Sequence, residues 1–436
     1  MTNDSPRHIV IVGGGLAGLA TAALLARSGN RVTLFERSQE LGGRAATSEH
    51  HGYFHNRGPH ALYLGGAAAQ VLAELDVSYT GRSPDLYGVA VRNGRAYTLP
   101  TSAKSMLTTR LFGVRARLEA GRQLLALRRV DPSDHRTVRQ WLDAGFAEPA
   151  ARDYVAALIR LSTYADAPDV TLVGDAARQL NGSSGPVLYV DGGWQSLVDG
   201  IEACALAAGA EVLRGCRVEG VTYAAERATG LRLAGGETVA ADAVVLAVPP
   251  EAARDLAGQH RSLAALAEQA VPARAACLDI GLTRLPNPRR KFGLGIDTPF
   301  YFSVHSLWAK LAPQGRVLAS VAKYLPAGAS PDPSRDLAEL EAFLDLVQPG
   351  WRKFEEHRQF LPNMVVHSAL PLAANGGIAG RPAPAVPGAA GLFLAGDWIG
   401  EDGWLADAVL GSARRAAGAI SASFTGPPVR AVAAVS

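Results

Sequence analysis

The apolar and polar residues of the first 44 positions form short buried segments with polar boundaries. Residues 9–12 are an uninterrupted apolar run, which predicts a strand buried in a parallel sheet. An alanine- and leucine-rich stretch over residues 17–27 predicts a helix that ends at Ser28-Gly29-Asn30. Residues 32–35 are a second apolar run. This order predicts a strand, a helix and a second strand at the start of the chain.

The alternation of strand and helix patterns stops between residues 81 and 185. Residues 88–100 predict a β-hairpin that turns at Asn93-Gly94. Apolar residues then recur at helical spacing, which predicts helices over residues 105–127, around Trp141 and over residues 150–161. In the first of these helices leucines alternate with arginines, as in helices that lie on a membrane surface. We expect core packing instead, because most amphipathic helices face a core.

Strand and helix patterns alternate again in the rest of the chain. The predicted strands are residues 211–213, 217–223, 230–234, 244–248, 275–282, 300–304, 317–324 and 391–397. The predicted helices are residues 195–206, 334–347 and 405–421. A proline-rich link at residues 381–384 precedes the last strand and helix.

Composition narrows the class of protein. The chain has 436 residues, 48% of them hydrophobic and 19% charged, so it is long enough for two domains with sizeable cores. A net charge of +3 is too small to indicate a nucleic-acid partner. Three cysteines without a CxxC pair predict neither a disulfide framework nor a zinc site. No apolar run resembles a signal region or reaches the roughly 18 residues of a membrane span, so we expect a cytoplasmic protein.

Three glycines between the first strand and the first helix have the spacing of a dinucleotide-binding turn. Gly13 permits the tight turn, Gly15 lets a pyrophosphate approach the backbone, and Gly18 lets the helix pack closely on the strand. The helix N-terminus offers free N–H groups and a partial positive charge to a diphosphate. Glu36 follows the second strand, where a carboxylate can accept hydrogen bonds from ribose and disfavours a 2′-phosphate. A dinucleotide without a 2′-phosphate is the predicted ligand.

Further motifs separate FAD from NAD by their resemblance to a known family. Residues 41–44 read Leu-Gly-Gly-Arg, and Gly58-Pro59 follows them. Near the C-terminus a predicted strand ends in Gly396-Asp397, and a short loop leads to a helix that begins with small residues. These segments resemble the FAD-binding motifs of the amine oxidase and phytoene desaturase superfamily. The resemblance implies FAD as the cofactor, with Arg44 donating hydrogen bonds to phosphate or ribityl oxygens.

The resemblance also implies individual contacts with FAD. The implied cofactor-binding residues are Gly13, Gly15, Leu16, Ala17, Gly18, Glu36, Arg37, Gly42, Gly43, Arg44, Gly58, Pro59, His60, Val218, Gly396, Asp397, Leu405, Ala406 and Ala408. Val218 would contact the adenine through its backbone, or would be an ordinary core valine. His60 would lie near the isoalloxazine ring, or would be a hydrogen-bonded structural histidine. Asp407 stands where the family more often has glycine, which would put an acid near the flavin O2 edge.

The fold that the resemblance implies is α/β, with a Rossmann-like FAD-binding domain of the GR2 type assembled from three chain segments. An interleaved α+β substrate-binding domain with a helical lid would complete the molecule. The expected FAD-binding segments are residues 1–80, 185–252 and 385–425, the expected substrate-binding segments are residues 81–184 and 253–384, and residues 426–436 are expected to form a flexible tail.

The function that follows is an FAD-dependent oxidoreductase that removes two electrons from an apolar small molecule, with hydride transfer to flavin N5. We favour a desaturase- or dehydrogenase-like reaction on a polyene, terpenoid or lipid-like substrate. A flavin amine oxidase is the alternative, and a non-redox flavin-dependent isomerase or a prenyl-binding carrier is a second one.

The sequence does not identify catalytic residues. His60 is a candidate because of its expected place near the flavin, and Lys323 is a candidate for the lysine that many amine oxidases hold beside flavin N5. No metal site is expected, because the histidines at 50, 51 and 55 lack supporting acids. The expected electron acceptor is oxygen or a quinone, and peripheral contact with a membrane stays open.

Overall fold

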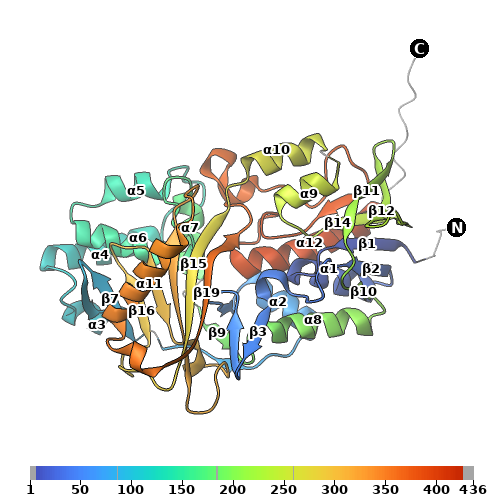
Figure 1. Ribbon diagram of the computed structural model, residues 1–436. Helices are drawn as coiled ribbons and strands as arrows, with labels where there is room; N and C mark the ends of the chain where they lie inside the picture. The colour runs from blue at the N-terminus through green and yellow to red at the C-terminus, as the bar shows by residue number, and fades with distance from the viewer. Residues whose placement is uncertain (1–5, 86, 183–184, 259, 426–436) are drawn as a thin grey trace.

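The computed structural model describes residues 6–85, 87–182, 185–258 and 260–425, and a five-stranded parallel sheet lies in the part of the molecule on the right in Figure 1. The strand order is β10-β2-β1-β14-β20, and every neighbouring pair is parallel. Its strands are β1 (His8–Val12), β2 (Arg31–Phe35), β10 (Glu211–Leu213), β14 (Ala243–Leu246) and β20 (Leu392–Leu394). Three distant parts of the chain therefore build one sheet, and the carboxyl ends of their strands meet along one edge.

Different layers cover the two faces of this sheet. One face carries the helices α1 (Leu16–Arg27), α2 (Ala67–Glu74), α8 (Gln195–Ala207) and α12 (Leu405–Thr425). The other face carries the antiparallel strands β11 (Val218–Ala224), β12 (Arg227–Leu233) and β13 (Thr238–Ala240), with the helices α9 (Pro250–Leu256) and α10 (Arg261–Gln269) beside them. Alanines and leucines make up most of α1, and the helix is buried along nearly all of its length against the sheet.

A second sheet has seven strands in the order β19-β15-β18-β17-β16-β7-β8. Its strands are β7 (Gly88–Arg92), β8 (Arg95–Thr98), β15 (Ala273–Leu282), β16 (Phe292–Gly295), β17 (Phe300–Ser303), β18 (Val317–Leu325) and β19 (Glu355–His367). The pairs are antiparallel except for β16 with β7. The predicted hairpin at Asn93-Gly94 is confirmed, whereas β19 was not predicted from the sequence.

Helices also cover both faces of the second sheet. The helix α11 (Pro333–Val347) packs on one face. The opposite face carries α3 (Ala103–Thr108), α4 (Val114–Leu127), α5 (Val138–Gly145), α6 (Pro149–Thr163) and α7 (Val173–Gly182), at the end of the molecule far from β1 and β2 (Figure 1). The remaining strands are β3 (Thr47–His50), β4 (Tyr53–Asn56), β5 (Leu62–Tyr63), β6 (Gly81–Arg82) and β9 (Val187–Val190).

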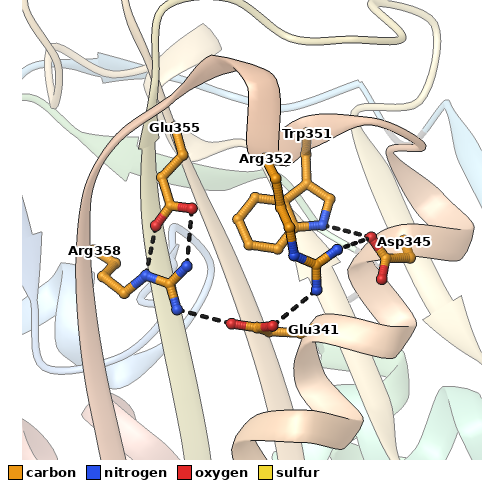
Figure 2. A network of polar contacts seen from close by, with 6 residues as sticks. All are labelled: Glu341, Asp345, Trp351, Arg352, Glu355 and Arg358. Carbon is orange, nitrogen blue, oxygen red and sulfur yellow. Dashed lines mark hydrogen bonds and ion pairs between the residues drawn. The ribbon is translucent and has the colours of Figure 1, made fainter.

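A network of charged side chains fixes the start of β19 to α11 (Figure 2). Glu341 on α11 accepts hydrogen bonds from Arg352 at 2.8 Å and from Arg358 at 2.7 Å. The fully buried Trp351 donates its indole N–H to Asp345 at 2.9 Å, and the Arg352 guanidinium lies 4.5 Å from the Trp351 ring centroid. The burial of Glu341 alone would raise its pKa, but the two arginines lower it below its usual value.

The expected helix over residues 105–127 is two helices, α3 and α4, with a break between them. Leu111 and Phe112 at the break are buried, and the Thr109 hydroxyl donates to the Thr98 carbonyl at 2.7 Å, so the chain turns inward there. The expectation of core packing is wrong for Leu107, Val114 and Leu118, whose side chains are exposed. Across the described ranges, no helix combines the length and the apolar character needed to cross a membrane.

Candidate functional site

A cavity of about 610 Å³ lies at the carboxyl edge of the parallel sheet and extends to β19 of the second sheet. It takes lining residues from the first βα turn, from the loop after β2, from the start of β11, and from the start of α12. Of the residues expected to bind a cofactor, sixteen line it: Gly13, Gly15, Leu16, Ala17, Glu36, Arg37, Gly42, Gly43, Arg44, Pro59, His60, Val218, Gly396, Asp397, Leu405 and Ala406.

The first βα turn presents bare backbone to this cavity. Gly13 has φ of +110° and donates its N–H to the Phe35 carbonyl at 2.9 Å, so the turn needs glycine there. Gly15 caps α1, and a Cβ atom built on it would have no neighbour closer than 3.9 Å, because the space beyond it is the cavity. The first N–H groups of α1 therefore begin at the cavity wall, as an anion site requires.

Gly18 does not line the cavity, and its role is in packing. A Cβ atom on Gly18 would lie 1.9 Å from the Gly13 carbonyl oxygen. The helix can therefore approach the strand this closely only when residue 18 has no side chain.

Glu36 stands at the end of β2 and holds the glycine turn. One carboxylate oxygen accepts the Gly14 N–H at 2.6 Å, and the other accepts the Ser38 N–H at 2.8 Å. Each oxygen keeps a further acceptor site, so the carboxylate can also accept hydrogen bonds from a ligand hydroxyl. Val218 lines the same end of the cavity from β11.

Arg44 and Asp397 form an ion pair across the middle of the cavity wall. The Arg44 guanidinium donates to Asp397 Oδ2 at 2.8 Å and to the Val366 carbonyl of β19 at 2.9 Å. Asp397 also accepts the Ser368 N–H at 2.8 Å, while its Oδ1 is buried and has no partner among the described residues. Burial alone would raise the pKa of Asp397, but Arg44 lowers it far below its usual value, so the carboxylate is ionised.

His60 and its neighbours form the wall that faces the second sheet. The His60 ring lies 4.7 Å from the Trp194 ring, and its Nδ1 is 2.8 Å from the Gly58 carbonyl. Burial lowers the pKa of His60, so the ring is neutral near pH 7. Gly58 does not line the cavity: with φ of +89° it packs against Met364, whose sulfur would lie 2.3 Å from a Cβ atom at this position.

The start of α12 forms another part of the cavity wall. Leu405 and Ala406 line the cavity, and Leu405 has φ of +55°, a strained backbone conformation for this residue type. Ala408 is fully buried beneath them and does not reach the cavity. Asp407 points away, and its Oδ1 accepts the Ala68 N–H of α2 at 2.8 Å. The expectation that Asp407 lies near the flavin O2 edge is therefore wrong, because this carboxylate caps α2.

The model of the flavin containing amine oxidoreductase family matches residues 16–421, which is most of the chain and includes all of the cavity lining except Val12, Gly13 and Gly15 of the first βα turn. The chain belongs to this family. Its cofactor is therefore FAD, and the resemblance of its motifs to the amine oxidase and phytoene desaturase superfamily is confirmed.

Individual relatives of this flavoprotein act on different substrates. It is 27% identical over 283 residues to 4,4′-diapolycopen-4-al dehydrogenase of Metabacillus indicus, and the match covers 55% of each chain. It is 48% identical over 61 residues to L-amino-acid oxidase of Bungarus fasciatus, which covers 14% of this chain and 12% of the relative. An oxidoreductase from Methanosarcina mazei has the same fold, with a TM-score of 0.76 and 19% identity over 93% of this chain and 99% of that one. The matches span about half or less of these curated relatives.

The cavity fits FAD in this flavoprotein. Gly15 and Gly43 leave open backbone where a diphosphate would lie, since a Cβ atom on either would meet nothing closer than 3.7 Å. Arg44 supplies a forked cation, and the unpartnered Oδ1 of Asp397 can accept a hydrogen bond from a ribityl hydroxyl.

Lys323 does not belong to this site. Its ammonium group is buried against Asp336 and Glu339 of α11, with both distances 2.6 Å, and it does not line the cavity. Strand β18 explains this placement, because Ala322 and Tyr324 face the helices α4–α7 while Lys323, between them, faces α11. Its candidacy as the lysine beside flavin N5 is therefore contradicted.

Several lining residues were not predicted from the sequence. Trp194 and Cys216 line the cavity, as do Tyr164 at the end of α6 and residues 364–366 of β19. Trp194 follows the Gly192-Gly193 turn directly, so that turn was the signal that could have revealed it. Tyr164 and residues 364–366 belong to the second sheet and its helices, where no motif marks the cavity.

Proposed function

We propose that this oxidoreductase removes two electrons from a neutral apolar substrate, of the polyene, terpenoid or lipid-like class, in a desaturase- or dehydrogenase-like reaction. When bound, FAD supplies the group that accepts a hydride from the substrate carbon. The walls of the cavity supply orientation and exclude water. Oxygen or a quinone is the proposed acceptor for the electrons.

The proposal rests on one observation. Within the described part of the chain, each carboxylate that lines the cavity already has a partner in the protein, either an arginine or backbone N–H groups. Glu36 binds two backbone N–H groups, Asp397 binds Arg44, and Asp255 lies 2.8 Å from Arg254. No lysine is among the described lining residues. A substrate ammonium group would therefore meet only carboxylates that already hold Arg44, Arg254 or the glycine turn, and burying it without an ion partner of its own would be costly.

The side chains near the second sheet support a neutral substrate in the same way. Tyr164, Trp194 and Met364 give apolar or aromatic surface, which suits a conjugated or branched hydrocarbon. Burial raises the pKa of the Tyr164 phenol and lowers that of His60, so both groups are uncharged near pH 7. The similarity to a dehydrogenase of diapolycopenal agrees with this class.

The test is anaerobic mixing of the holoprotein with a polyene or its aldehyde, an amine and an amino acid, in separate experiments that follow the absorbance of oxidised flavin. We expect loss of that absorbance with the polyene class and none with amines. Bleaching by an amine, followed by hydrogen peroxide and ammonia when oxygen is admitted, would assign the protein to the amine oxidases instead. That alternative draws its support from the short match to an L-amino-acid oxidase.

A further inference from the structure

Four of the seven large apolar residues that are exposed in the described part of the chain lie on α3 and α4. Leu107 is 68% exposed, Val114 70%, Leu118 71% and Leu125 57%. In α4 the last three occupy positions i, i+4 and i+11, which fall within about 40° of one another around the helix. They form one stripe, and the opposite side of α4 packs on α6 through Ala116 and Ala120. Scattered exposed leucines need no explanation, but a continuous stripe does.

Basic side chains surround this stripe. The exposed cations are Lys104, Arg110, Arg115, Arg122, Arg128 and Arg129. Glu119 is the sole acid between residues 103 and 130, and its carboxylate accepts the N–H groups of Ala147 and Glu148 at 3.0 and 2.8 Å. Of the six cations, Arg122 alone has an ion-pair partner in the described chain, Glu119 at 3.8 Å. The face is therefore apolar along its middle and strongly positive at its margins.

We propose that α3 and α4 form a docking surface for a lipid bilayer that contains anionic headgroups. Leucine and valine side chains would enter the boundary between headgroups and acyl chains, while the cations at the margins would bind phosphates. A nucleic acid would match the charge but not the apolar stripe, and a second copy of this chain would bring like charges together.

The docking surface lies one helix away from the cavity. Helix α4 packs against α6, and Tyr164, the residue directly after α6, lines the cavity. Bilayer contact would thus bring the helices next to the cavity close to apolar solutes dissolved in lipid. The proposal stands on the exposed residues alone and does not depend on the identity of the substrate.

The test is co-sedimentation of the holoprotein with vesicles of phosphatidylcholine alone or of phosphatidylcholine with phosphatidylglycerol, at low and high salt. We expect binding to the anionic vesicles that weakens at high salt. L118Q/L125Q should lower the vesicle partition coefficient about tenfold or more, because two side chains lose their apolar insertion. R115Q/R122Q should lower it by about tenfold or more as well, since each cation near an anionic surface contributes roughly 1 kcal/mol, or about fivefold.

The matched controls make the same types of substitution at exposed residues outside α3 and α4. L206Q/L346Q removes two exposed leucines from α8 and α11, and R261Q/R289Q removes two exposed arginines elsewhere, and both should bind vesicles as the wild type does. No binding of the wild type to anionic vesicles, or equal loss in the controls, would overturn the proposal. So would a wild-type dimer in sizing experiments that L118Q/L125Q converts to a monomer, because the stripe would then be an interface between copies.

Discussion

The two sheets of this flavoprotein are stabilised by different interactions. The parallel sheet and its helices are held by close packing of alanine, glycine and aliphatic residues, and the glycine turn allows the backbones to touch. The second sheet is held in part by buried or half-buried charges on α11: Asp336 with Lys323, and Glu341 with Arg352 and Arg358. A region that surrounds a fixed cofactor has little freedom in its backbone, whereas the second sheet, where we propose that the substrate lies, can be held by replaceable side chains.

The largest effect should come from Gly18→Ala. The new Cβ atom would meet the Gly13 carbonyl oxygen at 1.9 Å, and neither atom can move away unless the backbone of α1 parts from the turn after β1. We expect a loss of about 4 kcal/mol or more in the free energy of unfolding, together with loss of FAD. Thermal unfolding of the apoprotein and the flavin content after purification would measure both.

Gly15→Ala is the matched control for this change. Its Cβ atom has no neighbour within 3.9 Å and its φ of −78° suits alanine, so the apoprotein should unfold at the wild-type temperature. FAD affinity should still fall, by about tenfold or more, because the methyl group occupies the space of the diphosphate. An apoprotein destabilised equally by both substitutions would contradict the distinction between a packing glycine and a binding glycine.

A smaller effect, on the second sheet, should come from Lys323→Met. Burial alone would lower the pKa of this lysine, but Asp336 and Glu339 raise it, so the ammonium group is charged. Its removal leaves the buried Asp336 carboxylate without its cation, and we expect a loss of about 3 kcal/mol in the free energy of unfolding. Urea unfolding measures this loss, and the rate of flavin reduction by substrate should not change.

Lys310→Met provides the comparison for that substitution. Lys310 is exposed, and its ammonium group forms only a long ion pair with Asp191, at 4.0 Å. Its loss should therefore cost less than about 1 kcal/mol. If Lys323→Met instead slowed flavin reduction in a protein of unchanged stability, Lys323 would act in catalysis and the separation of the two regions would fail.

The same contrast explains what the sequence could predict. Cofactor contacts impose glycines and acids at fixed spacing, so the turn at residues 13–18, Glu36 and Gly396-Asp397 were visible as motifs. Strand β19 was missed because it carries Pro362 in its interior and mixes charged with apolar residues. It lies at the edge of its sheet, where proline and an irregular pattern are tolerated. The placement of Lys323 depended on which face of β18 met α11, and spacing alone did not reveal that.

The smallest effect should come from Glu341→Gln, at the network that joins α11 to β19. Glutamine keeps the shape but loses the charge that Arg352 and Arg358 share, so at pH 7 we expect a loss of about 1 kcal/mol in the free energy of unfolding. The exposed Glu268→Gln should cost nothing measurable.

The pH dependence of this loss tests its cause. Because the arginines lower the pKa of Glu341 in the folded protein, its stabilising contribution is complete above the ordinary value of 4.5 and is lost as the pH falls below it. The difference in unfolding free energy between wild type and Glu341→Gln should therefore shrink from pH 6 towards about pH 3, followed by urea unfolding at each pH. A difference that stayed constant over this range would mean that the ionised carboxylate contributes nothing, and that the second sheet depends on packing in the same way as the first.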